Sequence, residues 1–405
     1  MKYEKSGLIG GLGIQGDRVA TLLRGNLRQY VMIIALAVVI ILFQILTNGI
    51  LLRPLNISNL IAQNGYILIL ATGMLLCILT GGNIDLSVGS VAGFIGAISA
   101  VFILNMDMPV YVAILISLLI GVLIGCWHGF WIAYVGVPAF IATLAGMLLF
   151  RGLTLVILQG TSLAPLPAEY NFLAAGFVTD IANIPGINLL AILFGLLASV
   201  LFVWGELNAR ASKRKYKFDV IPKGMFIAKI LFIILVINAF TYALALHRGI
   251  PMVLVIVTAL VLIYTFVTTK TIPGRHIYAY GGNPKAAKLS GVKTKKVLFW
   301  VYVNMGFLAA LAGIIFTGRL NSATPKSGTG FELDAIAACF IGGASTTGGV
   351  GTIVGAIVGG LLMGVLNNGM SIVGVSIDWQ QAIKGFVLLA AVAFDVYSNS
   401  KSKSI

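Results

Sequence analysis

The sequence predicts an all-α polytopic integral membrane protein. Of its 405 residues, 59% are hydrophobic and only 10% are charged, whereas a soluble globular chain carries about a quarter charged residues. A chain this apolar has too little polar surface to cover itself in water, so a bilayer is its natural solvent. Its long apolar runs show no period-2 alternation, which favours helices over the strands of a membrane barrel.

About twelve apolar runs follow one another, most of them near the roughly 20 residues that one membrane crossing needs. They lie near residues 30–46, 57–79, 86–104, 109–132, 138–158, 187–205, 226–247, 250–268, 297–317, 333–345, 350–370 and 379–397. The run at 333–345 is short for a full crossing, so a half-helix is expected there and the prediction is about 10–12 transmembrane helices. The first run is too long for a signal-peptide core, so it is expected to remain as the first span.

Positive charge sets the expected orientation. Basic residues gather in the N-terminal segment 1–28, in two loops at 206–229 and 270–296, and in the tail 398–405. With the N-terminus in the cytosol, alternating the runs brings all four to the cytosolic side, as the positive-inside rule requires. The opposite loops hold few positive charges: Arg53, Arg248, Arg319 and Lys326. Residues 29–397 are therefore expected to form a single transmembrane domain.

Catalytic and metal-binding patterns are not found in the sequence. The net charge of +15 does not indicate nucleic-acid binding, because the basic residues lie between apolar runs and form no basic module. Cys77, Cys126 and Cys339 lie inside apolar runs and are expected to be free and buried. Nothing resembles HExxH, GxSxG or a phosphate-binding loop. The chain is expected to be no enzyme, to bind no metal or cofactor, and to draw energy for transport from a partner or an ion gradient.

Two glycine-rich breaks interrupt apolar runs, one at Thr80–Ser90 and one at Ile341–Gly351. Paired interruptions of this kind predict half-helices, a two-half internal pseudo-repeat and a transport pathway, although glycine also simply permits close helix packing. The candidate pathway or gate residues in the breaks are Gly81, Gly82, Asp85, Ser87, Gly342 and Gly343. Asp85 is either a pathway residue, because an acid in a membrane segment is costly, or a cap for the helix that follows it.

Three further charged residues lie within or beside apolar runs. Arg151 is expected to snorkel to an interface or to pair with an acid in the bundle. Glu332 and Asp334 precede the short run and have the position of helix-start acids. Structural roles are favoured over direct ligand contact for all three.

The basic stretch 270–296 is too ordered in composition for a mere linker. Gly281-Gly282-Asn283-Pro284 has the composition of a turn, in which Gly282 is expected to need a positive φ. Asn283 can cap a short helix that has Pro284 at its first position and ends at Gly291. Ala286 and Ala287 give this helix a small apolar face, so an exposed helix suited to docking on another protein is expected.

Three motifs, in this order, resemble the ribose/xylose-type sugar permeases of bacterial ABC importers, within the branched-chain amino acid/ribose/xylose permease family. Thr80–Ser90 is similar to that family's TGGIDLSVGS signature, residues 274–292 to its coupling segment GR..YA.GGNP.AA..SG, and residues 334–352 to its LDAIAA..IGG.S..GG.GT stretch. Asn367-Asn368-Gly369, Trp379-Gln380-Gln381 and Lys384-Gly385 fit its C-terminal pattern, so the resemblance covers about residues 55–397.

The sequence departs from the family pattern in two places. Asn83 is an extra residue between Gly82 and Ile84 relative to the family signature, and the region 187–250 has no counterpart in the pattern of the shorter ribose-type members. The second departure favours the longer xylose and multiple-sugar permeases.

The resemblance implies a permease subunit that carries a monosaccharide, xylose or a related pentose or hexose, across the bacterial cytoplasmic membrane. The implied partners are a cytosolic ABC ATPase that binds the ATP, an extracytoplasmic sugar-binding protein and a second permease copy. The residues implied to couple to the ATPase are Gly274, Arg275, Tyr278, Gly281, Gly282, Asn283, Pro284, Ala286, Ala287 and Gly291. An ion-coupled secondary transporter is the alternative that the interrupted repeats alone would allow.

Sugar hydroxyls pair with neutral donors and acceptors, so neutral polar side chains within the runs are expected to line a sugar pathway. Two candidates for lining the pathway, Asp85 and Ser87, lie in the first break. The other candidates, all neutral, are Gln63, Asn64, Thr143 and Asn304.

Overall fold

The computed structural model describes residues 27–181, 186–218 and 220–403, so most of the N-terminal segment 1–28 and the end of the tail 398–405 lie outside the described residues. Within the described residues, helices are the only regular secondary structure, apart from two isolated β-bridges. Eight of the described helices are long and apolar enough to cross a membrane. The prediction of an all-α polytopic membrane protein is confirmed.

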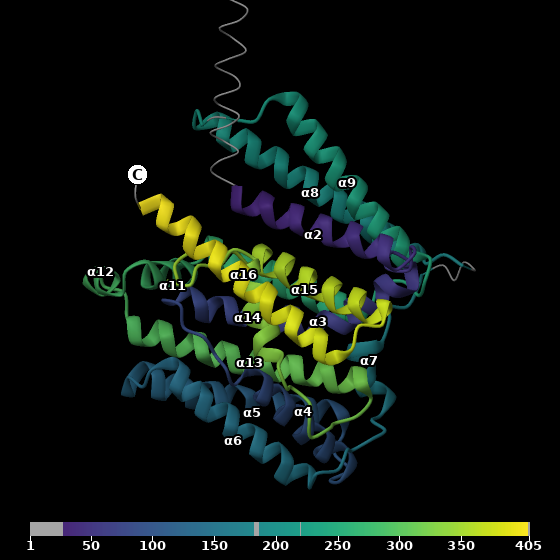
Figure 1. Cartoon of the computed structure of the whole chain (residues 1–405), viewed down its shortest axis with the longest axis vertical. Helices are drawn as coiled ribbons and strands as arrows, with labels where there is room; N and C mark the ends of the chain where they lie inside the picture. The colour runs from purple at the N-terminus through teal and green to yellow at the C-terminus, as the bar shows by residue number, and fades with distance from the viewer. Residues whose placement is uncertain (1–26, 182–185, 219, 404–405) are drawn as a thin grey trace, which may run out of the picture. The chain divides into compact units, whose positions relative to one another are not determined.

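Each of the twelve apolar runs contains a helix (Figure 1). These helices are α2 (Leu27–Leu46), α3 (Pro54–Leu79), α4 (Val88–Leu104), α5 (Val110–Gly129), α6 (Ala139–Leu158), α8 (Leu189–Lys215), α9 (Lys223–Ala245), α10 (Met252–Lys270), α13 (Thr294–Leu320), α14 (Phe331–Ile341), α15 (Ile353–Val373) and α16 (Ile377–Lys403). Four further elements lie between them: the π-helix η1 (Phe130–Val135), α7 (Ala168–Ala175), α11 (Ile272–Gly282) and α12 (Pro284–Leu289).

The basic stretch 206–229 is mostly helical, although a loop was predicted there. In the stretch 206–229, α8 continues to Lys215 and α9 already begins at Lys223. Lysine and arginine are good helix formers, and cations in the last turn of a helix are stabilised by its dipole. The basic residues therefore extend α8 beyond its apolar part.

The chain divides into two compact units, and one boundary falls inside α2, after Ile34. The larger unit comprises Ala35–Val178 and Ile250–Ile405. Inside it, α13 contacts α3, α4 and α5, and Figure 1 shows α13 running between α3 and α5. Most of α3 and α13 is buried, so these two helices form the core of the larger unit.

The other unit contains the hairpin of α8 and α9 within Thr179–Gly249. Asn188 caps α8 by accepting a hydrogen bond from Ala191 N at 2.9 Å. Asn238 donates to Ser199 Oγ at 2.8 Å and so joins the two helices at mid-length. A side-chain hydrogen bond between two apolar helices stabilises their pairing where no water is available.

The predicted half-helix is present as α14, which has only 11 residues. Gly330 precedes it with a φ of +81°, a backbone conformation that glycine adopts readily. The other break ends at α4, which has 17 residues and begins at Val88. Both breaks therefore lie beside helices shorter than the roughly 20 residues of a full crossing.

Candidate functional site

The predicted docking segment consists of α11 and α12. The side chain of Asn283 accepts a hydrogen bond from Ala286 N at 3.0 Å and caps α12, which has Pro284 as its first residue. Gly291 follows the helix with a φ of +87°. The predicted short helix and its cap are confirmed.

Three details of this segment differ from the prediction. Gly281 and Gly282 end α11 instead of forming a turn, and the φ of Gly282 is not positive. Ala287 is only 5% exposed, because Val292 N donates to Ala287 O at 3.0 Å and folds the chain back over it. Leu289, which the sequence analysis did not select, is 90% exposed. Leu289 therefore replaces Ala287 as the apolar residue open to a partner.

The first break, the second break and α11 meet at five glycines, which we call the glycine junction: Gly81, Gly82, Gly281, Gly348 and Gly349. A Cβ on Gly82 would lie 2.1 Å from Thr346 O, and one on Gly348 would lie 2.4 Å from Gly81 N. Real Cβ atoms do not approach backbone atoms this closely. The two breaks therefore contact each other directly, and glycine is required on both sides of the contact.

Gly281 brings α11 into the same contact. A Cβ on Gly281 would lie 1.8 Å from Leu79 O and 2.5 Å from Gly349 N. Gly349 N donates to Leu79 O at 3.0 Å, which links the second break to the last residue of α3. All three motifs that carry the family resemblance therefore converge on one point of the larger unit.

Tyr278 adds a side-chain link to this convergence. Its hydroxyl donates to Gly351 O at 2.7 Å. Burial raises the pKa of the Tyr278 hydroxyl above its usual value, so the group stays protonated and remains a donor at physiological pH. α11 is thus fixed to the second break by one hydrogen bond and one close glycine contact.

A second close approach joins the first residues of α4 to those just before α14. A Cβ on Gly89 would lie 2.3 Å from Gly328 O, and one on Gly93 would lie 2.4 Å from Ser327 O. Gly328 has a φ of +82°, and its own Cβ would lie 1.9 Å from Gly89 O. Because both sides are backbone, α4 and α14 begin at the same point.

α14 separates this meeting point from the start of the second break by about 16 Å, since the helix has 11 residues at about 1.5 Å per residue. α14 begins beside Gly89, and the loop that follows it reaches the glycine junction. Residues 82–87 connect the glycine junction to α4 without regular helix. The two short helices therefore begin side by side, at one end of α14.

Asp85 stabilises the start of α4 from two residues before its N-cap. Its Oδ1 accepts from Ser87 N at 2.9 Å and from Ser87 Oγ at 2.6 Å, and the residue is 3% exposed. Ser87 is the residue that precedes α4. These contacts support the capping interpretation of Asp85, while a pathway role for Asp85 and for Ser87 stays a prediction.

Both acids of the first turn of α14 have a basic partner on another helix. Arg151 Nη2 on α6 lies 3.9 Å from Glu332 Oε1, and Lys384 Nζ on α16 lies 3.0 Å from Asp334 Oδ1. The expected pairing of Arg151 with an acid and the helix-start position of both acids are confirmed. Glu332 Oε2 is buried and makes no hydrogen bond.

The remaining pathway candidates are spread over separate contacts. Asn64 donates to Leu60 O at 2.7 Å, Thr143 to Ala139 O at 2.9 Å, and Asn304 accepts from the hydroxyl of Tyr264. Gln63 accepts from Asn368 at 3.3 Å. None of these contacts joins two candidates, so their pathway role stays a prediction.

The glycines of the breaks have different surroundings. Gly342 lies against Gly355 O, where a Cβ would be 2.4 Å away, and Gly343 has a φ of +82°. Gly81 is exposed, and its role as a pathway or gate residue stays a prediction. It lies at the end of α3, outside the packed part of the core.

One polar cluster was missed by the sequence analysis. Asn56 and Asn368 exchange two hydrogen bonds, at 2.8 and 3.2 Å, and Asn368 also donates to Gln63. The cluster joins the first turns of α3 to α15. The adjacent amides Asn367-Asn368 inside an apolar run were the available signal, since buried amides need partners.

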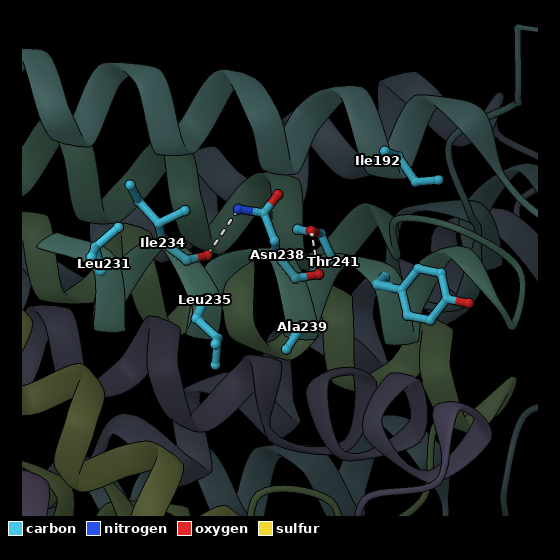
Figure 2. Close-up of a pocket in the computed structure, with 8 residues that line it drawn as sticks. Ile192, Leu231, Ile234, Leu235, Asn238, Ala239 and Thr241 are labelled. Atoms are coloured by element: carbon cyan, nitrogen blue, oxygen red, sulfur yellow. Dashed lines mark hydrogen bonds between the residues drawn. The ribbon is translucent and has the colours of Figure 1, made fainter.

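The hairpin unit carries an open apolar pocket (Figure 2). Its lining residues are Ile192, Leu231, Ile234, Leu235, Asn238, Ala239, Thr241 and Tyr242. The amide nitrogen of Asn238 already donates to Ile234 O and to Ser199 Oγ, both at 2.8 Å. This pocket therefore offers few free polar groups for a hydroxylated ligand.

Residues 56–392 match the family described as "Branched-chain amino acid transport system / permease component". The chain belongs to this family. It is 39% identical to the xylose transport system permease protein XylH of Haemophilus influenzae, over 93% of this chain and 98% of that protein. It is 36% identical to XylH of Escherichia coli strain K12, over 93% of this chain and 94% of that protein.

The chain is also similar to the ribose import permease protein RbsC of Bacillus subtilis. The identity is 37% over 89% of this chain and 91% of that protein. No solved structure matches the chain. The glycine junction and the meeting point of α4 and α14 both lie inside the part of the chain that the family match covers.

Proposed function

We propose that this chain is the membrane-spanning permease subunit of an ATP-driven ABC importer for a monosaccharide, xylose or a related pentose or hexose. The observation that carries the proposal is the convergence of three sugar-permease motifs at the glycine junction. The names of the relatives, xylose and ribose permeases, support a sugar as the substrate. The family description mentions branched-chain amino acids, but the relatives cited above are named for sugars.

In this proposal the energy comes from a partner, and the chain itself is no enzyme. A separate cytosolic ATPase binds ATP and docks on α11 and α12, whose outward side carries Ala286 and Leu289. Its movement reaches the two breaks through Gly281 and Tyr278, which contact the second break. A ligand can shift a conformational equilibrium only through contacts that differ between two states. The glycine junction supplies such contacts, since α11 and both breaks meet there.

The complete importer is proposed to hold two copies of this chain and an extracytoplasmic sugar-binding protein. Residues 29–397 would form one permease domain, with both termini and the coupling helices on the cytosolic side of the bacterial cytoplasmic membrane. The net positive charge of the basic ends of α8 and α9 and of the stretch 270–296 supports this orientation.

We expect cysteines introduced at Lys215 and at Lys288 to react with a membrane-impermeant maleimide only after the cells are permeabilised. The positive-inside rule predicts a cytosolic position for both. A cysteine at Arg53, in the opposite loop, is the matched control and should react in intact cells. Labelling of the Lys215→Cys or Lys288→Cys variant in intact cells would refute the orientation.

The function is tested by isolating the tagged chain with its partners and reconstituting the complex in liposomes. An ABC permease should co-purify with an ATPase, and uptake of xylose or ribose should require ATP and tolerate ionophores. An ion-coupled secondary transporter would show the reverse: uptake without an ATPase, abolished by ionophores. That result would replace the proposed function with the alternative.

A further inference from the structure

We propose that the meeting point of α4 and α14 binds hydroxyl groups of the transported monosaccharide, through Glu332 Oε2 and Ser90 Oγ. The inference rests on the proposed function and assigns the sugar a site in this chain. Neither residue was among the pathway candidates that the sequence suggested.

The location favours a ligand site. Two short helices begin there, at the backbone contact of Gly89 with Gly328. Their first N–H groups have no partner within the helix and carry the positive ends of the helix dipoles. Substrate sites of membrane transporters are typically formed where discontinuous helices begin near the middle of the bilayer.

A buried acceptor points into this location. Glu332 is 7% exposed, and its Oε2 is buried without a hydrogen-bond partner. The same oxygen lies 2.3 Å from the position that a Cβ on Gly89 would occupy, so it is directed at the first turn of α4. An unpaired buried carboxylate oxygen costs free energy, which a bound hydroxyl would recover.

A second unpaired group follows directly in the chain. Ser90, next to Gly89, is 3% exposed, and its hydroxyl is buried without a partner. A carboxylate oxygen accepts hydrogen bonds, whereas a serine hydroxyl both donates and accepts. Two hydroxyls on adjacent sugar carbons can therefore pair with both groups, one donating to Glu332 Oε2 and the other exchanging a hydrogen bond with Ser90 Oγ.

The charge balance favours a neutral ligand over an ion. Glu332 is paired with Arg151 at 3.9 Å, and Asp334 in the same helical turn is paired with Lys384 at 3.0 Å. The four groups sum to zero charge, so a bound ion would add an uncompensated charge beside two buried acids. Arg151 is the partly open member, with 36% of its side chain exposed, and it marks the side from which a ligand reaches Glu332.

The test uses the reconstituted permease–ATPase complex without the binding protein, so that sugar protection reports on this chain alone. Ser90→Cys is placed in a Cys126→Ala background and labelled with a small thiosulfonate during ATP turnover. We expect 10 mM xylose or ribose, assayed separately, to slow labelling at least threefold. Adding Glu332→Gln should remove most of the protection, since a neutral amide oxygen accepts a hydrogen bond more weakly than a carboxylate oxygen and the amide nitrogen accepts none.

Two matched variants make the result specific. Ser117→Cys on α5 is the control for labelling, because Ser117 is also buried with an unpaired hydroxyl and lies outside the meeting point. Asp334→Asn is the control for Glu332→Gln, because it removes the neighbouring acid but leaves Glu332 in place. Sugar should not protect Ser117→Cys, and protection of Ser90→Cys should survive Asp334→Asn.

Three outcomes would overturn the site. In the first, the Ser90→Cys thiol does not react during turnover, so no path reaches it. In the second, sugar does not slow its reaction. In the third, protection persists with Glu332→Gln, so Glu332 does not bind the sugar. Transport by the unmodified complex is measured in parallel. Absent uptake refutes the proposed function, whereas uptake without protection refutes only this site.

Discussion

Gly281→Ala is expected to abolish transport while leaving the chain inserted in the membrane. The added Cβ would lie 1.8 Å from Leu79 O and 2.5 Å from Gly349 N, so it meets backbone that no side-chain rotation can clear. Overpacking of this kind costs about 1–3 kcal/mol and separates the elements in contact. Because α11 would move away from both breaks, we expect sugar uptake to fall by at least tenfold, a fall that 1.4 kcal/mol suffices to cause.

Gly282→Ala is the matched control for this prediction. A Cβ at this neighbouring position would meet no heavy atom within 4 Å, and its φ is in the ordinary range. The same change of one methyl group, one residue later, should leave uptake within about twofold of the unmodified protein, since exposed substitutions usually change stability by less than 0.5 kcal/mol. Equal uptake for the two variants would show that the glycine junction does not transmit the movement of α11.

The junction and the proposed sugar site are connected by one short helix. α14 begins beside Gly89 and ends at Ile341, just before the second break. Its first turn is tied to α6 through Glu332 and to α16 through Asp334. A rigid helix transmits a displacement at one end to the other. A shift of α11 is therefore expected to reach Glu332 through α14, which gives the ATPase a mechanical route to the sugar.

Local chemistry made the helices and their caps predictable from the sequence. The period and length of the apolar runs gave every long helix, because backbone groups in a bilayer must be satisfied within each span. Asn283 could be assigned as a cap because cap geometry depends on residues only three apart. The half-helix at 331–341 followed from its length alone.

Long-range contacts could not be predicted from the sequence. A glycine pair indicates that another part of the backbone approaches closely, but it does not identify that part. Only the structure shows which residues contact Gly281 and Gly89. Which side of a six-residue helix faces inward depends on the fold around it, which is why Ala287 was assigned outward. Polar residues such as Asn64 and Thr143 bind carbonyls of their own helix, an option that an apolar run always offers.

Leu289→Glu is expected to abolish binding of the ATPase without affecting the fold of the permease. Leu289 is the most exposed large hydrophobic side chain of the described residues, at 90% exposure, and it ends α12. A leucine fully buried on docking contributes about 1.5–3 kcal/mol. A glutamate would add the cost of burying a charge. We expect the affinity for the ATPase to fall by about thirtyfold or more, which corresponds to about 2 kcal/mol at an interface hot spot.

Two variants separate this docking role from effects of charge and folding. Lys288→Gln changes the charge of the neighbouring exposed residue by one unit and should weaken binding by less than about threefold, as expected of a peripheral charge. Ala287→Glu places a carboxylate at a residue that is 5% exposed, so it should lower the melting temperature of the isolated permease, which Leu289→Glu should not. Affinity is measured by titrating detergent-solubilised permease with the purified ATPase. If Leu289→Glu binds the ATPase as tightly as Lys288→Gln does, Leu289 is not buried in the assembled importer. In that case α12 is not the docking helix.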